Sequence, residues 1–598
     1  MEQRGCFLGV ECSLTGKRWE ERLGDSRQGL ALSQQLDLPE VVGRILAARG
    51  VGPEDAETFL NPTLRDCLPD PSVFMDMDRA AQRLLQAIEG GEKLAVFGDY
   101  DVDGATASAV LSRFFGAIGI EIEIYIPDRL AEGYGPNAPA LKRLRAQGAE
   151  IVITVDCGIT AFEALGEATE AGLEIIVVDH HAAEPRLPPA VAVVNPNRLD
   201  DVSGQGQLAA VGVAFLLVVA INRALRDAGW YRRQNRPEPD LRQWLDLVAL
   251  GTVCDVVPLT GINRALVTQG LKVMAARGNA GLAALSDVSR IDEKPGTYHA
   301  GFLLGPRVNA GGRVGEAPLG ARLLTCDDPG AAAAMAAQLD GYNGERKEIE
   351  LQVLDQAIRQ VESAGTGEGL VVAASEGWHA GVIGIVASRL KERFNKPALV
   401  IALENGIGKG SARSVPGVDL GAAVIAARQQ GLLLNGGGHP MAAGLTVAAE
   451  NLAELTAFLD ERLARRLAEI DYQPSLGIDG ALKPRAANLE LLEQIERCGP
   501  FGVGNAQPRF ALPAVRVAKA SVVGQNHVRC FLGDSQGGSL KAIAFRALDS
   551  DLGPALLQTA GLPLHVVGRL QIDRWGGRES VQFIIEDAAT LPSGGSSA

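Results

Sequence analysis

Aspartates follow directly after three apolar segments in the first third of this chain. LAVFGD ends at Asp99, EIVITVD ends at Asp156, and EIIVVD ends at Asp179. In GDYDVDGAT, Asp101 and Asp103 continue the series at alternate positions. Carboxylates gathered at one place repel one another strongly unless cations neutralise them. A single aspartate after a strand is more often part of a solvated turn, but three converging strand ends predict a metal site.

Two adjacent histidines, His180 and His181, come immediately after Asp179, in a chain with 7 histidines among 598 residues. Oxygen ligands alone suit Mg²⁺ or Ca²⁺, and an imidazole shifts the preference toward Mn²⁺. We therefore expect Mn²⁺, with Mg²⁺ as the alternative. The carboxylates exceed what one ion needs, and two ions about 3.5–4 Å apart would use them to cleave a phosphoester. One imidazole would bind metal, the other would face the phosphate or the attacking water, and Asp179 would orient an imidazole.

The segment DYDVDG also matches the beginning of an EF-hand calcium loop. That loop needs a bidentate glutamate at its twelfth position, between two helices. Counted from Asp99, the twelfth position is Val110, and the flanks are strand-like before and helix-like after. An EF-hand is therefore excluded.

Apolar segments that alternate with helical ones must position these side chains. The alternation predicts an α/β fold with a parallel sheet covered by helices on both faces. Functional sites in such sheets lie at the carboxyl ends of the strands, where the aspartates fall. Strands are expected at 94–99, 121–127, 150–156, 174–179 and 190–195.

The chain is too long for one hydrophobic core, so several domains are expected. Residues 329–364 are rich in alanine and charge and predict one or two linking helices, and short strands with glycine-rich turns near the C-terminus predict a small barrel. The expected parts are an N-terminal helical lead-in (1–75), a catalytic α/β domain (76–328), a linker helix (329–364), a smaller α/β domain (365–470), a C-terminal OB-type β-barrel (471–590) and a disordered tail (591–598).

No segment has the pattern of an export signal or a membrane span. Residues 1–22 lack a basic region followed by an apolar one. The apolar run VGVAFLLVVAI (211–221) is shorter than a membrane span and predicts a buried helix. The 8 cysteines are scattered without CxxC spacing, which favours reduced thiols in the cytoplasm.

The formal net charge of −15 argues against a general nucleic-acid coat protein, because phosphate contacts need lysine and arginine. Residues 471–598 carry equal numbers of basic and acidic residues, so a local basic channel is compatible with the composition. OB barrels bind single strands by stacking bases on aromatic rings. The candidates are Phe531, Phe545, Trp575 and Phe583, with Arg529, Arg574 and Arg578 nearby, and Phe545 and Phe583 are expected to belong to the core.

Several motifs resemble a known family. GDYDVDGAT, VITVDCGIT, VVDHH and LGTVCDVVPL, in this order, resemble the four motifs of the DHH phosphoesterase superfamily, and LNGGGHPMAAG resembles the GGH motif of its DHHA1 domain. LGPRVNAGGRVGEA, SEGWHAGVIGIVASRL, GSARS and CGPFGVGNAQPRF narrow the resemblance to single-stranded-DNA-specific exonucleases of this superfamily. The resemblance covers about residues 25–590. It makes 76–328 the DHH domain and 365–470 the DHHA1 domain.

The resemblance implies a monomeric 5′→3′ exonuclease of DNA repair and recombination, which hydrolyses single-stranded DNA with two metal ions. It also implies single-strand-binding protein and a helicase as partners. The implied metal ligands are Asp99, Asp101, Asp103, Asp156, His180 and Asp255. The implied catalytic residues are His181, Asp179 and Arg307. The implied substrate-binding residues are Asn309, Arg313, His379, Ser411, Arg413 and His439. Gly312 departs from the pattern, where a larger small residue is expected, and should not disturb the chemistry.

The smaller α/β domain also has features that suit a phosphate. GKGSARS predicts a short loop whose backbone N–H groups and Arg413 would bind a terminal phosphate, although a plain surface turn is the alternative. GGGHP predicts a flexible loop carrying His439, and His379 precedes a helix start. The resemblance implies that this domain closes over the active site and grips the 5′ end.

Two other functions compete with the exonuclease. One is a phosphodiesterase of very short oligonucleotides or cyclic dinucleotides, and such enzymes usually lack the C-terminal barrel. The other is a non-catalytic scaffold at replication forks, which would have lost metal ligands. The predicted barrel argues against the first, and the full set of expected ligands argues against the second.

Overall fold

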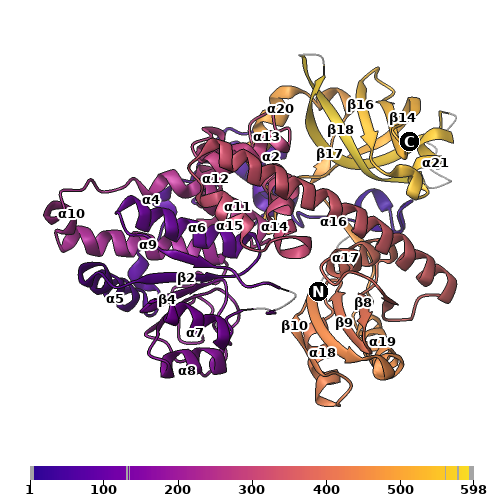
Figure 1. Ribbon diagram of the computed structural model, residues 1–598. Coiled ribbons are helices and arrows are strands. Elements are labelled where there is room, and N and C mark those ends of the chain that lie inside the picture. The colour runs from indigo at the N-terminus through magenta and orange to yellow at the C-terminus, as the bar shows by residue number, and fades with distance from the viewer. Residues whose placement is uncertain (1–5, 130–131, 134, 559–560, 576–577, 592–598) are drawn as a thin grey trace.

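The computed structural model describes residues 6–129, 132–133, 135–558, 561–575 and 578–591. The predicted disordered tail lies outside these residues except for Leu591, and so do the side chains of Trp575 and Arg578. Figure 1 shows a catalytic α/β part on the left, a smaller α/β part at the lower right and a β-barrel at the upper right. A long helix, α16, runs between them.

The catalytic part is built on a parallel sheet of five strands in the order β3-β2-β4-β5-β6. All five residues of β2 and of β4 are buried, as expected for a sheet with helices on both faces. The predicted parallel α/β sheet is therefore confirmed. Its strands are β2 (Leu94–Gly98), β3 (Glu123–Tyr125), β4 (Ile151–Val155), β5 (Glu174–Val178) and β6 (Ala192–Val194).

Helices cover both faces of this sheet with two separate apolar cores. The larger core contains the first part of α9, which includes the apolar run 211–221, and that run is a buried helix as predicted. The helices on this side are α5 (Met77–Gly90), α6 (Val102–Ala117), α9 (Ala210–Asp227) and α11 (Leu245–Cys254). On the other side are α7 (Ala138–Ala146) and α8 (Phe162–Glu170).

Further helices complete the catalytic part and lead away from it. The π-helix η4 (His299–Leu304) continues directly into α14 (Gly305–Val314). The predicted linker is one 36-residue helix, α16 (Pro329–Ala364). The remaining helices are α10 (Trp230–Arg233), α12 (Gly261–Ala275), α13 (Ala280–Val288) and α15 (Leu319–Thr325).

The smaller α/β part has a five-stranded sheet in the order β10-β11-β9-β8-β7. Two of its strands correct the sequence analysis, because GKGSARS and GGGHP were expected to be loops. They form β9 (Ile407–Arg413) and β10 (Asn435–His439), since glycine pairs through its backbone even though it has low strand propensity. The other elements are β7 (Val371–Glu376), α17 (Ile383–Phe394), β8 (Ala398–Glu404), α18 (Leu420–Gln429), β11 (Ala442–Ala448) and α19 (Leu452–Glu469).

The C-terminal part is a closed barrel, because β14 pairs with both β15 and β17. The predicted OB-type barrel is confirmed. Its strands are β13 (Gly480–Ala481), β14 (Phe510–Val523), β15 (His527–Gly533), β16 (Ser539–Ala544), β17 (Pro563–Trp575) and β18 (Arg578–Thr590), with helices α20 (Leu489–Glu496) and α21 (Leu552–Gln558) beside them.

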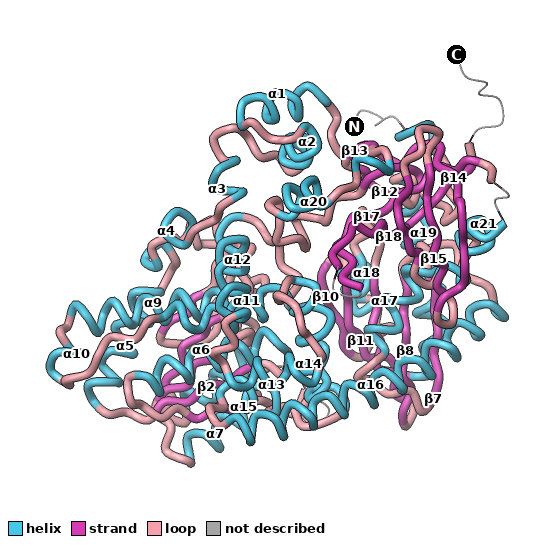
Figure 2. The backbone as a smooth tube through the Cα atoms, turned by 90° about the horizontal axis from the view of Figure 1, so that it is seen from above, coloured by secondary structure: helices cyan, strands magenta, loops and turns pink. Residues whose placement is uncertain are grey.

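The N-terminal segment is joined to this barrel rather than leading only into the catalytic part. A strand that the sequence did not indicate, β1 (Arg18–Glu21), pairs in parallel with β12 (Ser475–Ile478). Trp19 is fully buried, and its Nε1 donates to Asp587 of the barrel over 2.8 Å. Figure 2 shows α1 (Ser26–Leu36) and α2 (Glu40–Ala48) near α20. Ile45 and Leu46 of α2 share the core of the barrel, so the two ends of the chain form one packed unit.

Two short helices, α3 (Ala56–Leu60) and α4 (Leu64–Cys67), lead from this unit to the catalytic part. Within the described part of the chain, no helix is both long and apolar enough to cross a membrane.

Candidate active site

The carboxyl ends of the parallel strands bring the predicted aspartates and histidines together. Asp99 follows β2, Asp156 follows β4, and Asp179 follows β5, so all three emerge at one edge of the sheet. These side chains form three overlapping groups, and within each group the potential ligand atoms lie within 4.8 Å of one another. These groups are Asp99, Asp101 and Asp156; Asp156, His180 and His181; and Asp103, His180 and Asp255.

His180 lies at the centre of the cluster. Its Nε2 is 3.3 Å from Asp156 Oδ1, 3.7 Å from Asp255 Oδ2 and 3.9 Å from Asp103 Oδ2. Its Nδ1 lies 3.0 Å from the carbonyl oxygen of Leu208, which fixes the ring and leaves Nε2 directed at the carboxylates. Three carboxylates around one imidazole nitrogen have the composition and spacing of a metal-ligand set.

Helix ends bring in the ligands that the strands cannot supply. Asp101 caps α6 by accepting from the backbone N–H groups of Asp103 and Gly104. Asp103 is 1% exposed, and its carboxylate accepts from the N–H groups of Ala210 and Val211 at the start of α9. A helix N-terminus stabilises a buried carboxylate, so Asp103 is held in place before any ion binds.

Asp255 reaches the cluster from the opposite direction. It is the residue at which α11 ends, and the resemblance alone pointed to it, since no strand or acidic pattern precedes it. Asp156 (φ 61°) and Val256 (φ 64°) both have left-handed backbones. Such conformations cost about 1–3 kcal/mol each and are found where surrounding structure fixes a functional group.

Asp179 and His181 form a pair beside the cluster. Asp179 is fully buried, and its Oδ1 lies 2.8 Å from His181 Nδ1. The same carboxylate accepts from the N–H groups of Ile159, His180 and His181, so every part of it is engaged. Burial disfavours a charged imidazole, but the hydrogen bond and charge of Asp179 outweigh it and raise the pKa of His181. The contact with Asp179 thus fixes the orientation of the His181 ring.

The electrostatics of the cluster favour a bound cation. Burial, followed by repulsion from neighbouring carboxylates, raises the pKa of Asp103 to about 7 and that of Asp255 to about 9, and it raises those of Asp99 and Asp156 as well. Burial lowers the pKa of His180 to about 4, which keeps this imidazole neutral as a metal ligand must be. Among the described residues, Asp99 Oδ1, His180 Nε2 and Asp255 Oδ2 are buried without a hydrogen-bond partner. A divalent cation would satisfy all three atoms, so the residues present fit the metal that the sequence predicts.

A group of arginines adjoins the metal-ligand cluster, and sequence reasoning found only part of it. Burial, together with the nearby charges of Arg129 and Arg346, lowers the pKa of Arg313 to about 10. Burial and then Arg129 also lower the pKa of Arg413. Arg129 lies over the ring of Tyr100, 5.2 Å from its centre. Tyr100 stands between Asp99 and Asp101 in the sequence. Repulsion among guanidinium groups is relieved by an anion, so this arginine group is a candidate phosphate site.

The arginine group spans the catalytic part and the smaller α/β part. Arg313 of α14 donates to the carbonyl of Gly381, just before α17, over 2.9 Å. His379 Nδ1 accepts from the N–H of Gly381, which places this predicted residue beside Arg313. Arg413 donates to Ser411 Oγ over 3.1 Å on β9. Since the N–H groups of β9 belong to its sheet, the side chains, not loop amides, would have to bind a phosphate there.

Other predicted residues lie apart from the carboxylates or act on the backbone. Arg307 binds Asp340 of α16 over 2.9 Å and the carbonyl of Leu303, and no interaction among the described residues joins it to the cluster. Asn309 accepts from the N–H of Val102, and so attaches α14 to the start of α6. His439 is exposed at the end of β10. The roles of these three residues stay predictions.

Gly312 has a structural reason to lack a side chain. A Cβ at this position would lie 2.8 Å from the backbone oxygen of Tyr100. The glycine therefore lets α14 lie directly against the loop that carries Asp99 and Asp101.

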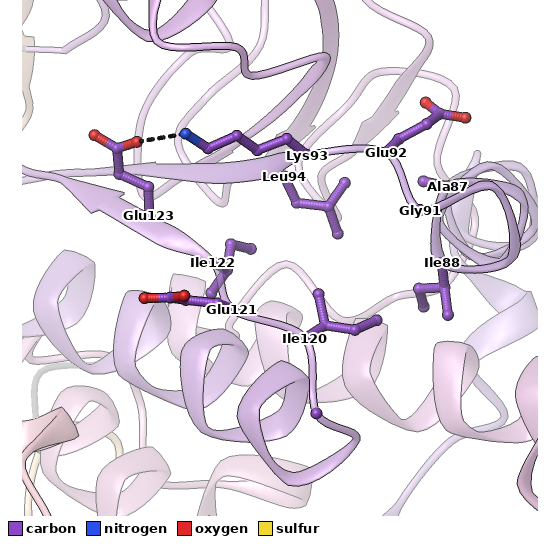
Figure 3. Close-up of a pocket in the computed structure, with 11 residues that line it drawn as sticks. Ala87, Ile88, Gly91, Glu92, Lys93, Leu94, Ile120, Glu121, Ile122 and Glu123 are labelled. Atoms are coloured by element: carbon purple, nitrogen blue, oxygen red, sulfur yellow. Dashed lines mark ion pairs between the residues drawn. The ribbon is translucent and has the colours of Figure 1, made fainter. Parts of the chain in front are cut away.

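A pocket of about 670 Å³ lies at the other end of the catalytic sheet and does not belong to this site. Figure 3 shows Lys93 directed toward Glu123, with Ile88, Leu94 and Ile120 around the space. These residues lie near the amino ends of β2 and β3, whereas the aspartates follow the carboxyl ends.

The outer face of the barrel carries a row of basic and aromatic side chains. Phe531 of β15 is 38% exposed and lies directly across from Lys519 of β14 and Lys541 of β16. The expectation that Phe545 belongs to the core is wrong, because it is 55% exposed, while Phe583 is buried as expected. Arg574 is engaged by Glu293 and Glu579 and is therefore less available to a strand than the sequence suggested.

Comparisons with known proteins agree with this architecture. Family models match the DHH family N-terminal domain at residues 93–252, the DHHA1 domain at 367–465 and the RecJ OB domain at 478–587. The single-stranded-DNA-specific exonuclease RecJ of Bacillus subtilis (strain 168) is 34% identical over 96% of this chain and 71% of its own length. The protein of the same name from Escherichia coli (strain K12) is 34% identical over 92% of this chain and 96% of its own length.

A solved structure is similar over nearly the whole chain. The crystal structure of RecJ from Thermus thermophilus in complex with Mn²⁺ matches 95% of this chain and 78% of that chain, with 28% identity and a TM-score of 0.76. A structure of the same protein in complex with Mg²⁺ matches with a TM-score of 0.72 and 26% identity.

The parallel sheet, the carboxylate–histidine cluster at its carboxyl edge and the attached DHHA1 domain define a DHH phosphoesterase. One relative is 34% identical over 96% of its own length, and the OB domain also matches, so the family can be assigned more narrowly. The chain belongs to the RecJ family of single-stranded-DNA-specific exonucleases.

Proposed function

We propose that this chain hydrolyses single-stranded DNA from the 5′ end toward the 3′ end by two-metal-ion phosphodiester cleavage, in DNA repair and recombination. The observation that carries the proposal is the position of the arginine group directly beside the carboxylate–histidine cluster. The cluster would form the hydrolytic site, and the arginines would bind a terminal phosphate where the catalytic part meets the smaller α/β part.

The carboxylate–histidine cluster would hold the metal ions through the six predicted ligands. Two of the three groups share Asp156, and two share His180, so these two residues would be central to holding the metal. When bound, Mn²⁺ or Mg²⁺ would supply a nucleophilic water and neutralise charge on the phosphate. His181 would bind the scissile phosphate or donate a proton to the leaving oxygen, and Asp179 would hold its ring in position.

The proposed 5′ polarity rests on the arginine group. A terminal 5′ phosphate carries more charge than an internal phosphodiester, and the partly buried guanidinium groups of Arg313 and Arg413 would favour it. A 3′ end terminates in an uncharged hydroxyl and gains nothing from this group. Ser411, which is bonded to Arg413, would add a neutral donor to the phosphate.

The barrel would bind the strand downstream of the cut. Phe531, with Lys519 beside it, combines an aromatic ring for base stacking with a cation for the backbone, whereas Lys541 is already paired with Asp573. Removing the whole barrel is an unsuitable test, because the barrel shares its core with α1 and α2. Substitution of Phe531 is the cleaner change, since this side chain is 38% exposed.

Several finer statements complete the proposal. The proposal also includes the domain division predicted from the sequence, a monomeric state and a cytoplasmic location. It further includes single-strand-binding protein and a helicase as partners. The short-oligonucleotide phosphodiesterase is less well supported, because this chain carries the barrel. The non-catalytic scaffold is less well supported, because all six predicted ligands lie in the cluster.

The test uses strands labelled at the 5′ end or at the 3′ end, with Mn²⁺ or Mg²⁺, and a blunt duplex as control. We expect the 5′ label to be released first as a mononucleotide and the duplex to resist. Early release of the 3′ label, or equal degradation of both substrates, would contradict the proposal.

A pair of variants tests the phosphate site. Arg413→Ala should weaken cleavage of a 5′-phosphorylated strand far more than cleavage of a 5′-hydroxyl strand. The matched control is Arg428→Ala, an exposed arginine on α18 of the same domain, which should leave both rates unchanged. An equal loss on both strands would assign Arg413 to folding or to general strand binding instead.

A further inference from the structure

A pair of exposed aromatic rings stands outside the sites described above. Tyr298, the residue just before η4, is 61% exposed, and Phe302 within η4 is 70% exposed. Their ring centres lie 5.4 Å apart and their planes are inclined by 23°, so the rings are stacked. Neighbouring residues on the same helix, Ala300 and Leu304, are fully buried, so the helix is anchored while the two rings face solvent.

The helix that carries these rings is packed against the metal-ligand cluster. Cys254, the residue before Asp255, lies with its Sγ 3.4 Å from the carbonyl of Ala300. The same helix continues into α14, where Asn309 binds the N–H of Val102 in the metal loop. Phe302 and Asn309 are seven residues apart, which is about 10 Å along a helix. The rings therefore stand within a few nucleotides of the proposed cutting site.

A further exposed apolar side chain, Val256, directly follows Asp255 in the chain. Val256 is 65% exposed, although it is β-branched and has a left-handed backbone with φ 64°. Valine rarely adopts this conformation, so the packing around Asp255 must fix it. The backbone that holds a metal ligand thus also presents an apolar side chain to solvent.

The surface continues from these residues to the barrel. Thr297 Oγ1 donates to the carbonyl of Phe501 over 2.8 Å, and the N–H of Leu259 donates to the carbonyl of Val503 over 2.8 Å. Val503 is itself 45% exposed, and Phe501 packs against the core of the barrel. Glu293, close to Tyr298 in sequence, binds Arg574 of β17. Figure 1 shows α14 between the sheet that contains β2 and the barrel.

We propose that Tyr298 and Phe302 form a base-stacking platform for single-stranded DNA between the metal centre and the barrel, with Val256 and Val503 at its edges. The inference rests on the proposed function and identifies a binding subsite for the same substrate. Stacked aromatic rings accept any base, because every base has a π face. A protein partner on this surface would cover the region next to Asp255 that a strand has to cross, so a strand is the better occupant.

Fluorescence of 2-aminopurine tests the platform position by position. A single 2-aminopurine is placed at each of the first eight nucleotides of a 5′-phosphorylated strand, and binding is measured with Ca²⁺ to prevent cleavage. We expect stacking to quench two adjacent positions. Phe302→Ala and Tyr298→Ala together should abolish this quenching, while Phe302→Tyr should retain it. Quenching that is identical in the double variant and the wild type would overturn the proposal.

Steady-state cleavage provides the second measurement. Loss of one stacked base should raise KM for a 20-nucleotide strand by about 5- to 150-fold and leave kcat within about 2-fold. The matched control is Leu351→Ala, which removes an apolar side chain that is 65% exposed on α16, and it should change neither value. A double variant with an unchanged KM would also overturn the proposal of a platform. So would a double variant in which kcat falls together with the rise in KM.

The two proposals can fail separately. A wild-type protein that does not degrade single strands would refute the proposed function. A wild-type protein that degrades them, beside a double variant with the same KM and the same quenching, would refute the platform alone. In that case the exposed rings would be a surface for a protein partner.

Discussion

Replacement of Arg264 by methionine should weaken the junction between the catalytic part and both ends of the chain. Arg264 belongs to α12 and is 2% exposed. Its guanidinium donates to the carbonyls of Phe59 over 2.7 Å, of Cys498 over 3.0 Å and of Gly499. It also lies 3.7 Å from the centre of the Phe59 ring. One side chain therefore joins three segments that are far apart in the sequence.

Two opposing effects decide the size of the loss. Burial lowers the pKa of Arg264 to about 10, which corresponds to about 3 kcal/mol of unfavourable charge burial that methionine would remove. Against this, the carbonyls of Phe59 and Gly499 lose their donor, while that of Cys498 keeps Asn505. Each unsatisfied carbonyl costs about 1–3 kcal/mol, and the lost cation–π contact costs about 1–2 kcal/mol. The hydrogen bonds outweigh the charge, and we expect a net loss of about 2–3 kcal/mol.

Denaturant unfolding followed by tryptophan fluorescence measures this loss. The control is Arg277→Met, just after α12, because the Arg277 side chain is 42% exposed and binds Asp287 at the surface. Its substitution should change the unfolding free energy by less than about 0.5 kcal/mol. Limited proteolysis should show earlier cleavage near residues 59 and 499 in Arg264→Met. Equal stabilities of the two variants would refute the argument that Arg264 joins the three segments.

Four other predictions concern chemistry, pH, metal and strand length. Asp156→Ala should lower cleavage by about 10³-fold with the fold intact, and near-wild-type cleavage in Mn²⁺ would exclude the two-metal site. Burial raises the pKa of Asp246 to about 6, so the native state loses stability as pH rises from about 4 to 6. Asp246→Asn should therefore be more stable than the wild type by up to about 3 kcal/mol at pH 7 but not at pH 3. Thermal unfolding at the two pH values measures the difference. Mn²⁺ at 100 times its Kd should stabilise the wild type by about 2.7 kcal/mol, and Asp156→Ala should lose most of this gain. Phe531→Ala should raise KM for a forty-nucleotide strand more than for a four-nucleotide strand, and an equal effect on both would place Phe531 outside the strand path.

The catalytic sheet could be predicted because each strand is a short apolar run that ends in an acid. β2, β4 and β5 are buried over most of their length, so their sequences contain little else than apolar residues, and the aspartates mark the ends. The metal-ligand cluster follows, since parallel strands place their carboxyl ends at one edge. This part of the site can therefore be predicted from short segments of the sequence.

Other parts of the site depend on contacts that no local pattern records. Asp255 ends a helix with no acidic neighbours in its turn, and only packing brings it to His180. Arg129 and Arg346 are ordinary arginines in the sequence, and only the folding of the chain brings their charges near Arg313. β9 and β10 were expected to be loops because glycine has no side chain to give a strand its alternation.

The energetics of the metal centre explain why its supporting structure is so extensively buried. The cluster combines carboxyl groups whose pKa values burial has raised with left-handed backbones at Asp156 and Val256. Each of these features opposes folding when no cation is present. They are held by fully buried strands on one side and by the ends of α6, α9 and α11 on the other. Asp255, a proposed metal ligand, and Val256, at the edge of the proposed platform, are adjacent in the chain, so in both proposals metal binding and strand binding would depend on one short segment.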